Sequence, residues 1–165
     1  MHQIHALLIA KILLLLAVAN GAPVLARWLL KDWAGTALDG GKRFADGRPI
    51  LGSSKTWRGL VSAIAATALA APLAGLPLFM GLITGVTAML GDLLSSFVKR
   101  RLGLAPSAMA LGLDQIPESL LPLLALRFFL PLTLADGARI LAAFFGGELL
   151  LSRLLYQLHI RDRPY

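Results

Sequence analysis

The chain of 165 residues contains no cysteine and only three histidines, at positions 2, 5 and 159. A disulfide framework and a thiolate metal site are therefore excluded, and the histidines lack the spacing of a zinc site. Charged residues make up 15% of the chain, against about a quarter in soluble domains. The sequence also lacks a fixed-period repeat, the GxxxxGK[ST] spacing of a P-loop and any nucleic-acid-binding motif. Thiol and zinc chemistry and an ordinary soluble domain are thus disfavoured.

Apolar residues are abundant instead: 57% of the chain is hydrophobic and the mean hydropathy is +0.73. This composition predicts one all-α integral-membrane domain, residues 1–165, with five transmembrane helices. We expect spans at about 4–30, 60–76, 77–98, 118–135 and 137–158, with polar loops at 31–58 and 99–117. The first apolar run has no convincing small-residue cleavage site, so we expect a retained span rather than a signal peptide.

Basic residues dominate the charge, with 16 Lys+Arg against 9 Asp+Glu and a formal net charge of +7. Most of them fall in the two polar loops and the C-terminal segment, which ends in RDRPY. The positive-inside rule places these segments in the cytoplasm and the N-terminus outside. We therefore expect a multi-pass protein of the cell membrane whose site faces the cytoplasm. Lipid headgroups or phosphates are better partners for the cations than nucleic acid, and a homodimer is left open.

A few polar or helix-breaking residues interrupt the predicted spans. Pro23 removes a backbone donor, so we expect it to kink or break the first helix. Asn20 either satisfies the backbone that Pro23 frees or faces a polar cavity. Arg139 and Glu148 are able to pair with each other or with Arg127.

The segment 91–101, GDLLSSFVKRR, ends an otherwise apolar helix. Asp92, Ser96 and Lys99 recur at offsets of four and three and so share one helix face. A carboxylate inside a membrane helix costs on the order of 3 kcal/mol and by default marks a functional site. The alternative is an aspartate that Lys99 or a neighbouring helix neutralises. By helix rise, Asp92 lies about 10 Å inside the level of Lys99, near the cytoplasmic mouth.

The run 52–59, GSSKTWRG, brings backbone amides, hydroxyl groups and two cations, Lys55 and Arg58, to the start of a helix. Such a segment suits a phosphate group, and the alternative is a juxtamembrane cationic anchor. On the same side lie Asp92 and the pair Asp114–Gln115. Two carboxylates among several cations suit Mg²⁺ bound together with phosphate. The cations would stabilise the charge on a transferring phosphoryl group.

Several of these motifs resemble the CDP-archaeol synthase family, which belongs with the CDP-diacylglycerol synthases among membrane CTP-transferases. The most specific are KTWRG at 55–59, GD followed by S-x-x-KR at 91–100, and LDQ at 113–115. ANGAPVL at 19–25, DGGK at 39–42, DGR at 46–48 and the closing RDRPY also match. The resemblance therefore covers residues 19–165 in order.

The resemblance implies a cytidylyltransferase that transfers CMP from CTP to a lipid phosphate similar to 2,3-di-O-geranylgeranylglyceryl phosphate, releases pyrophosphate and uses Mg²⁺. In the family pattern the metal falls on Asp92 and Asp114, and both are expected to be catalytic together with Lys55 and Lys99. Arg100 joins the two lysines near the nucleotide phosphates. The residues expected to bind CTP or the lipid phosphate are Lys42, Arg48, Lys55, Thr56, Arg58, Ser96, Lys99, Arg100 and Gln115.

The chain departs from the family pattern at two positions. The acidic residue expected two positions after Gln115 is absent, and Glu118 follows one position later. Glu118 either takes that role or lies outside the metal site. Ser95 stands where the bacterial enzymes have a glutamate.

Three other interpretations remain at this stage. The lipid could be a diacyl phosphatidic acid, as for a CDP-diacylglycerol synthase, or another lipid phosphate. A CDP-alcohol phosphotransferase is disfavoured because neither DG pair, at 39–40 and 46–47, is followed by AR. A channel or assembly subunit would use Asp92 as an ion or pairing site but would leave the polar loop 31–58 without a purpose.

Overall fold

The computed structural model describes residues 2–31, 33–106 and 108–159. Within these residues the chain forms five α-helices and two isolated antiparallel bridges, with no extended strand. The helices are α1 (His2–Leu30), α2 (Trp57–Leu73), α3 (Leu78–Arg101), α4 (Gln115–Leu126) and α5 (Leu134–Gln157). The all-α prediction is confirmed, and the RDRPY motif lies outside the described residues.

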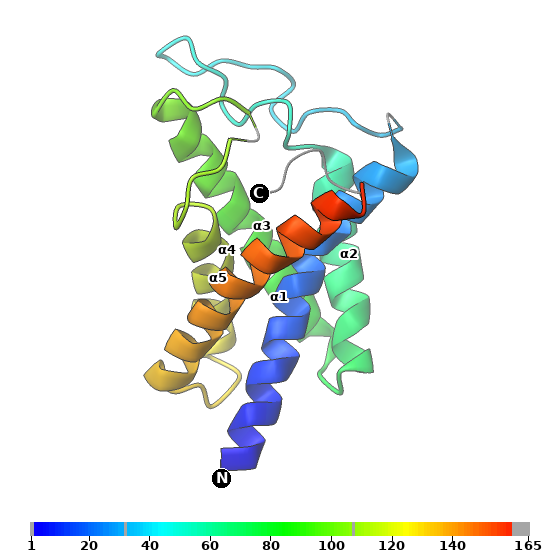
Figure 1. Cartoon of the computed structure of the whole chain (residues 1–165), viewed down its shortest axis with the longest axis vertical. Coiled ribbons are helices and arrows are strands. Elements are labelled where there is room, and N and C mark those ends of the chain that lie inside the picture. The colour runs from blue at the N-terminus through cyan, green and yellow to red at the C-terminus, as the bar shows by residue number, and fades with distance from the viewer. Residues whose placement is uncertain (1, 32, 107, 160–165) are drawn as a thin grey trace.

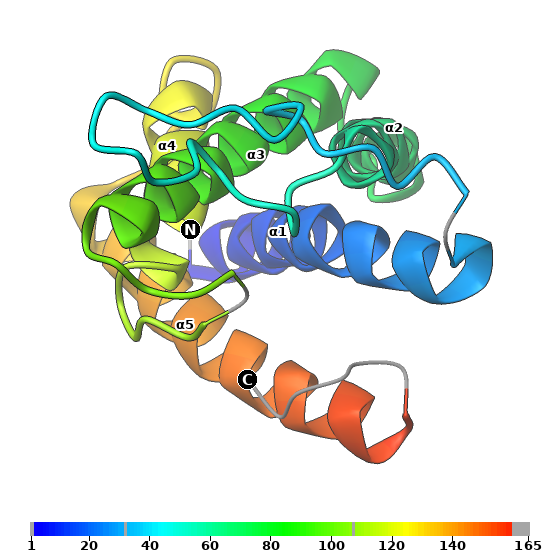
Figure 2. The same cartoon turned by 90° about the horizontal axis from the view of Figure 1, so that it is seen from above.

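Successive helices run in alternating directions (Figure 1). The two polar loops therefore lie together at one end, which we call the loop end, and the short links 74–77 and 127–133 lie at the other. Seen from the loop end, the segment after α1 passes across α3, and α5 diverges from α1 toward its own C-terminus (Figure 2). The gathering of both polar loops at one end agrees with the expectation from the sequence.

The core is built from apolar side chains of four helices. Ile12 and Leu16 of α1, Met80 of α3, Leu126 of α4 and Phe144 of α5 belong to one buried cluster. The remaining helix, α2, packs on α3 through small residues. The backbones come so close that a Cβ on Gly81 would lie 2.3 Å from the Thr67 carbonyl oxygen. Small residues of this kind are the usual means by which membrane helices approach closely.

The fourth helix is shorter than expected. It covers Gln115–Leu126 rather than 118–135, and its 12 residues reach about 18 Å against the roughly 30 Å of a hydrocarbon core. Pro131 lacks a backbone donor and restricts Leu130, which disfavours helix here. Thr133 and Asp136 then form a capping box that starts α5 anew. Within the described residues, two helices have the length and hydropathy of a membrane span, within His5–Leu30 and Leu78–Arg101.

The first helix continues through Pro23, so of the kink or break expected there, the break does not occur. The side-chain amide of Asn20 donates to the carbonyl of Leu16 at 3.2 Å. The carbonyl that loses its usual donor to Pro23 is a different one, that of Ala19. Asn20 also lines a cavity of about 210 Å³ between α1 and α5, together with Glu148 of α5. Asn20 therefore does not satisfy the backbone group that Pro23 frees, and the structure supports the second alternative, a cavity with polar residues in its wall.

The close contact of α2 with α3 predicts an unequal response to added methyl groups. We expect Gly81→Ala to lower the free energy of unfolding by about 1–3 kcal/mol, because its Cβ would overlap α2 backbone. Gly137→Ala in α5 is the control, since a Cβ there meets nothing within 4 Å. Thermal unfolding in detergent would measure both, and equal midpoints would contradict this account of the interface.

Candidate functional site

The polar loop between α1 and α2 is folded around the carboxylate of Asp39. Its Oδ1 accepts a hydrogen bond from the backbone N–H of Gly41 at 3.0 Å, and its Oδ2 accepts from those of Leu51 and Gly52 at 2.9 Å. Burial raises the pKa of Asp39, but the backbone donors outweigh it and hold the pKa below its ordinary value of 3.8. The loop thus has a defined shape set by one charged group.

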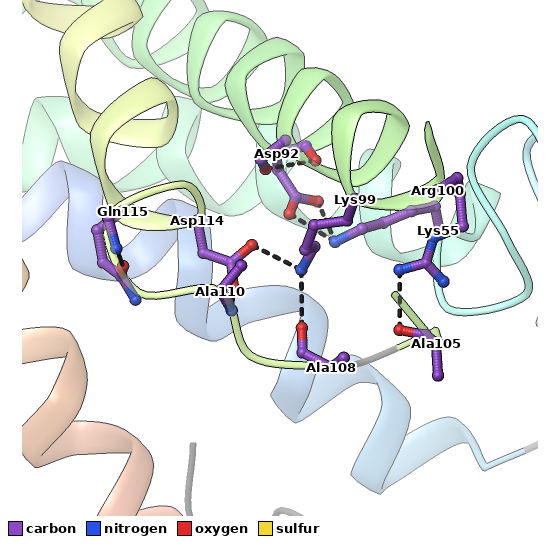
Figure 3. Close-up of polar contacts among 11 residues, drawn as sticks. Lys55, Asp92, Lys99, Arg100, Ala105, Ala108, Ala110, Asp114 and Gln115 are labelled. Atoms are coloured by element: carbon purple, nitrogen blue, oxygen red, sulfur yellow. Dashed lines mark hydrogen bonds and ion pairs between the residues drawn. The ribbon is translucent and has the colours of Figure 1, made fainter. Parts of the chain in front are cut away.

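Lys55 connects this loop to α3. It stands just before Thr56, the N-cap of α2, whose hydroxyl accepts from the backbone N–H of Gly59 at 3.2 Å. The Lys55 ammonium donates to both oxygens of Asp92 at 2.5 and 2.6 Å (Figure 3). Burial lowers the pKa of Lys55, but the carboxylates of Asp92 and then Glu118 raise it more, so the ammonium stays charged. A cavity of about 70 Å³ opens beside this pair.

A second ion pair lies beside the first. Nζ of Lys99, in the last turn of α3, lies 2.6 Å from Oδ1 of Asp114 and donates to the carbonyl of Ala108 at 3.1 Å (Figure 3). Asp114 precedes α4, and its Oδ2 accepts from the backbone N–H of Ala110 at 3.0 Å. The alternative in which Lys99 is the partner of Asp92 is therefore wrong, since Lys55 is that partner. Asp92 and Asp114, which are far apart in the sequence, thus lie with Lys55 and Lys99 in one cluster of charged side chains at the loop end.

The helix face predicted from the spacing in α3 contributes to this cluster. Ser96 and Lys99 are 2% and 7% exposed, so both are buried beneath the loops. Ser95 donates its hydroxyl to the carbonyl of Asp92 at 3.0 Å and brings no charge to the position. The glutamate of the bacterial enzymes thus has no charged equivalent at residue 95.

Glu118 is the residue whose place the sequence left open, and it lies against Asp92. It is 5% exposed, and its carboxyl group lies within hydrogen-bonding range of that of Asp92. The approach depends on Gly91, because a Cβ there would lie 2.3 Å from the carbonyl oxygen of Pro117. The signal that could have found Glu118 is its spacing of four from Asp114, which places both at one side of the start of α4.

Arg100 is buried beside the cluster with part of its guanidinium unused. It is 3% exposed and donates through Nη2 to the carbonyl of Ala105 at 2.8 Å (Figure 3). Its Nε and Nη1 have no hydrogen-bond partner among the described residues. Gly52, whose φ of +92° favours glycine, leaves room for it, since a Cβ there would lie 3.5 Å from Nη1. A buried cationic donor of this kind is suited to an anionic ligand.

Other residues expected to bind substrate hold the loops in shape. Arg58 donates to the carbonyls of Lys31 and, at 2.9 Å, Trp33, which ties the start of the loop to α2. Arg48 donates to the carbonyls of Arg101 and, at 3.5 Å, Arg100 at the end of α3. The Gln115 side-chain oxygen accepts from the backbone N–H of Gly112 at 2.8 Å, Thr56 caps α2, and Lys42 is exposed.

Comparisons with known proteins agree on one family. A family model described as CDP-archaeol synthase matches residues 4–165. The CDP-archaeol synthase of Sulfurisphaera tokodaii is 35% identical over 154 residues, covering 90% of this chain and 89% of that protein. The one of Hyperthermus butylicus is 47% identical over 104 residues, covering 59% of each. A solved structure described as an intramembrane enzyme for archaeal membrane lipids biosynthesis is 31% identical, with a TM-score of 0.74, covering 86% of this chain and 90% of that one.

The lowered pKa of Asp39 predicts an acid-sensitive loop. Its stabilising effect is fully present above the ordinary value of 3.8 and is lost as the pH falls through the lower folded value. We expect Asp39→Asn at neutral pH to reproduce the acid state, because an amide has one acceptor oxygen and cannot accept from Gly41 on one side and from Leu51 and Gly52 on the other. Hydrogen exchange of these three backbone amides would show the loss, with Ser53→Ala, an exposed change in the same loop, as the control. Unchanged protection in Asp39→Asn would contradict the prediction.

Proposed function

Because the chain belongs to the CDP-archaeol synthase family, we infer that it is a CTP-dependent membrane cytidylyltransferase that transfers CMP to a lipid phosphate. A phosphate oxygen of the lipid attacks the α-phosphorus of CTP. The bond from that phosphorus to the bridging oxygen breaks, and pyrophosphate leaves. The product is a CDP-activated lipid that stays in the membrane.

One observation carries the proposed site beyond family membership: Arg100 is buried with Nε and Nη1 free of partners among the described residues. We assign these donors to the phosphates of CTP. Lys55 and Lys99, on either side of the aspartates, would exchange their carboxylate partners for phosphate oxygens as the nucleotide binds. Charge growing on the transferring group and on pyrophosphate would then face three cations in a partly dry site.

We propose that the carboxylates of the cluster hold the Mg²⁺ ion that the family resemblance implies. Asp92 and Glu118 lie within hydrogen-bonding range of each other, and carboxyl groups this close hold a shared proton or a cation. Carboxylate oxygens together with substrate phosphates are the ligands that Mg²⁺ prefers. We propose that Asp92 and Glu118 hold the ion, with Asp114 as a third charge nearby. Bound there, Mg²⁺ would offset the negative charge of the nucleotide phosphates.

The described residues form no ready-made metal cluster of three or more carboxylates or histidines. Asp114 in particular uses both oxygens, one for Lys99 and one for the backbone of Ala110. This favours Glu118 over Asp114 as the second metal ligand and gives Asp114 the role of holding Lys99 and the start of α4. An ion that arrives together with CTP fits a site whose carboxylates are paired with lysines.

The lipid end of the reaction is supported by the cavity between α1 and α5. Leu13 and Ala17 of α1 and Phe144 of α5 give it apolar walls, which suit a hydrocarbon chain. Glu148 also lines it and acts electrostatically on Glu118 of the carboxylate cluster. We propose that a lipid chain lies there while its phosphate reaches the cluster. The lipid need not leave the bilayer.

We propose that all five helices cross or enter the membrane, with the loop end in the cytoplasm and the N-terminus outside. The support is the concentration of lysines and arginines in the loops at that end, which the positive-inside rule places in the cytoplasm. The site would then open where CTP is dissolved. The short α4 would be covered by neighbouring helices rather than span the bilayer alone.

The family assignment decides among the earlier alternatives. It favours a lipid phosphate of the archaeol type over phosphatidic acid. The channel or assembly-subunit interpretation is wrong, because the family is enzymatic and the loop 31–58, which that interpretation left without a purpose, supplies Lys55 to the cluster.

The proposed reaction predicts pyrophosphate release that depends on both substrates. Purified protein with CTP, Mg²⁺ and 2,3-di-O-geranylgeranylglyceryl phosphate should release pyrophosphate and form the CDP-lipid. Release should fall at least about tenfold with a phosphatidic acid of matched phosphate concentration, if the archaeol type is the substrate. Coupled pyrophosphate detection and lipid chromatography would measure both. Absence of turnover with every lipid phosphate tested would refute the proposed function.

The metal assignment predicts that two carboxylates matter more for ion binding than the third. In the presence of CTP, we expect Asp92→Asn and Glu118→Gln each to weaken Mn²⁺ binding by about 10- to 100-fold, and Asp114→Asn to weaken it less. Electron paramagnetic resonance of Mn²⁺ would give the affinities without relying on activity. If Asp114→Asn weakens binding as much as Asp92→Asn while Glu118→Gln does not, the second ligand is Asp114.

A further inference from the structure

Residues 43–49 form a hairpin that is closed by the antiparallel bridge between Arg43 and Pro49. Arg101, to which no motif assigned a role, joins this hairpin to the end of α3. Its guanidinium carbon lies 4.8 Å from the ring centre of Phe44 in the hairpin and 5.0 Å from that of Phe97 in α3. The two rings meet edge to face, with centres 5.4 Å apart. Nη1 of Arg101 also lies 2.5 Å from the carboxylate of Asp46. Cation–π and charge contacts thus converge on one side chain.

Hydrogen bonds from arginine side chains to backbone carbonyls run across the same contact in both directions. Arg101 donates to the carbonyls of Pro49 and, at 3.4 Å, Arg48 in the hairpin. Arg48 donates in return to the carbonyls of Arg101 and Arg100. The carbonyl of Arg100 also accepts from the backbone N–H of Gly103 at 3.1 Å. The last carbonyls of a helix lack partners within it, and Arg48 supplies one to the carbonyl of Arg101. We call this arrangement of Phe44, Asp46, Arg48 and Arg101 the clasp.

The second residue after α3 is shaped to admit the clasp. Gly103 has a φ of +76°, a conformation that glycine adopts without strain. A Cβ at this position would lie 3.4 Å from Nη1 of Arg48, so Gly103 is packed against the guanidinium. The end of α3 therefore combines a left-handed glycine with an arginine supplied by a distant loop.

The clasp affects the neighbouring Arg100 through the loop. From the hairpin the chain continues to Leu51 and Gly52, both held by Asp39, and Gly52 lies against the Arg100 side chain. Arg100 is enclosed between this part of the loop and the carbonyl of Ala105. The direction in which its unused N–H groups point thus depends on where the loop sits over α3. Arg101 ties the loop to that helix one residue away.

We propose that Arg101 is a positioning residue: through the clasp it holds the 43–49 hairpin on α3 and so keeps Arg100 aimed at the nucleotide phosphates. The inference rests on the proposed function, because it concerns how CTP is bound. It also gives Arg48 a place in the clasp instead of a contact with substrate. Arg101 itself touches neither substrate in this scheme.

The first test compares two variants that each remove one positive charge. We expect Arg101→Met to raise the KM for CTP about tenfold, with a much smaller change in kcat and in the KM for the lipid. Arg43→Met is the matched control, because Arg43 lies in the same hairpin and, among the described residues, its Nη1 donates only to the carbonyl of Gly47. A general loss of attraction for CTP would affect both variants equally. An equal KM for CTP in the two, or an equal loss in all parameters for Arg101→Met, would overturn the proposal.

The second test does not need the reaction. Release of the hairpin from α3 should make the Phe44–Ala45 bond more accessible to chymotrypsin, so cleavage at this bond should be faster in Arg101→Met than in Arg43→Met or the natural protein. Phe44→Leu should raise the KM for CTP as Arg101→Met does, whereas Phe44→Trp should not, because it keeps an aromatic face. The double variant Arg101→Met with Phe44→Leu should have a KM for CTP no higher than either single variant. Unchanged cleavage would refute the clasp even if turnover is normal. Absent turnover with faster cleavage would instead refute the proposed function alone.

Discussion

The bond between Lys55 and Asp92 is the interaction on which the site depends. A carboxylate in an apolar helix requires a counter-charge, and removal of one partner from a buried pair costs about 3–5 kcal/mol. Here the counter-charge comes from a loop rather than from α3 itself, with Nζ bound to both carboxylate oxygens at 2.5 and 2.6 Å. The need to neutralise one helical aspartate therefore also fixes the position of a polar loop. Lys99 and Asp114 repeat the arrangement for the second loop.

Much of the site followed from the sequence because its residues obey simple spacing rules. Asp92, Ser96 and Lys99 share a helix face by periodicity, and the distribution of basic residues indicated that both polar loops lie at one end. The sequence did not predict which lysine pairs with which aspartate. Spacing along α3 favours Lys99 as the partner of Asp92 and says nothing of Lys55, which comes from another segment. The sequence did not predict that α4 ends at Leu126 or that α1 continues through Pro23. The reason is that a proline weakens a helix without deciding where the helix ends.

Arginine roles were the least predictable part. Arg48, Arg58 and Arg100 look alike in the sequence, each within or beside a motif, and each donates to a backbone carbonyl. Arg100 differs because two of its donors, Nε and Nη1, are buried without a partner among the described residues, against Nε alone in Arg58. The difference comes from loop geometry that Asp39 and the left-handed glycines impose. Glu118 was uncertain for a related reason: its contact with Asp92 requires the backbone of α4 to approach α3 at Gly91.

That approach at Gly91, together with the one at Gly81, has a consequence for the departure of the product. The third helix meets α2 and α4 backbone to backbone, so neither side has space through which two hydrocarbon tails can slide. A CDP-lipid formed at the loop end is still anchored in the bilayer and must move sideways. The gap between α1 and α5 offers free volume in that plane. With the loop end in the cytoplasm, as proposed, the finished lipid would diffuse into the leaflet along α5 and pyrophosphate would leave into the aqueous phase.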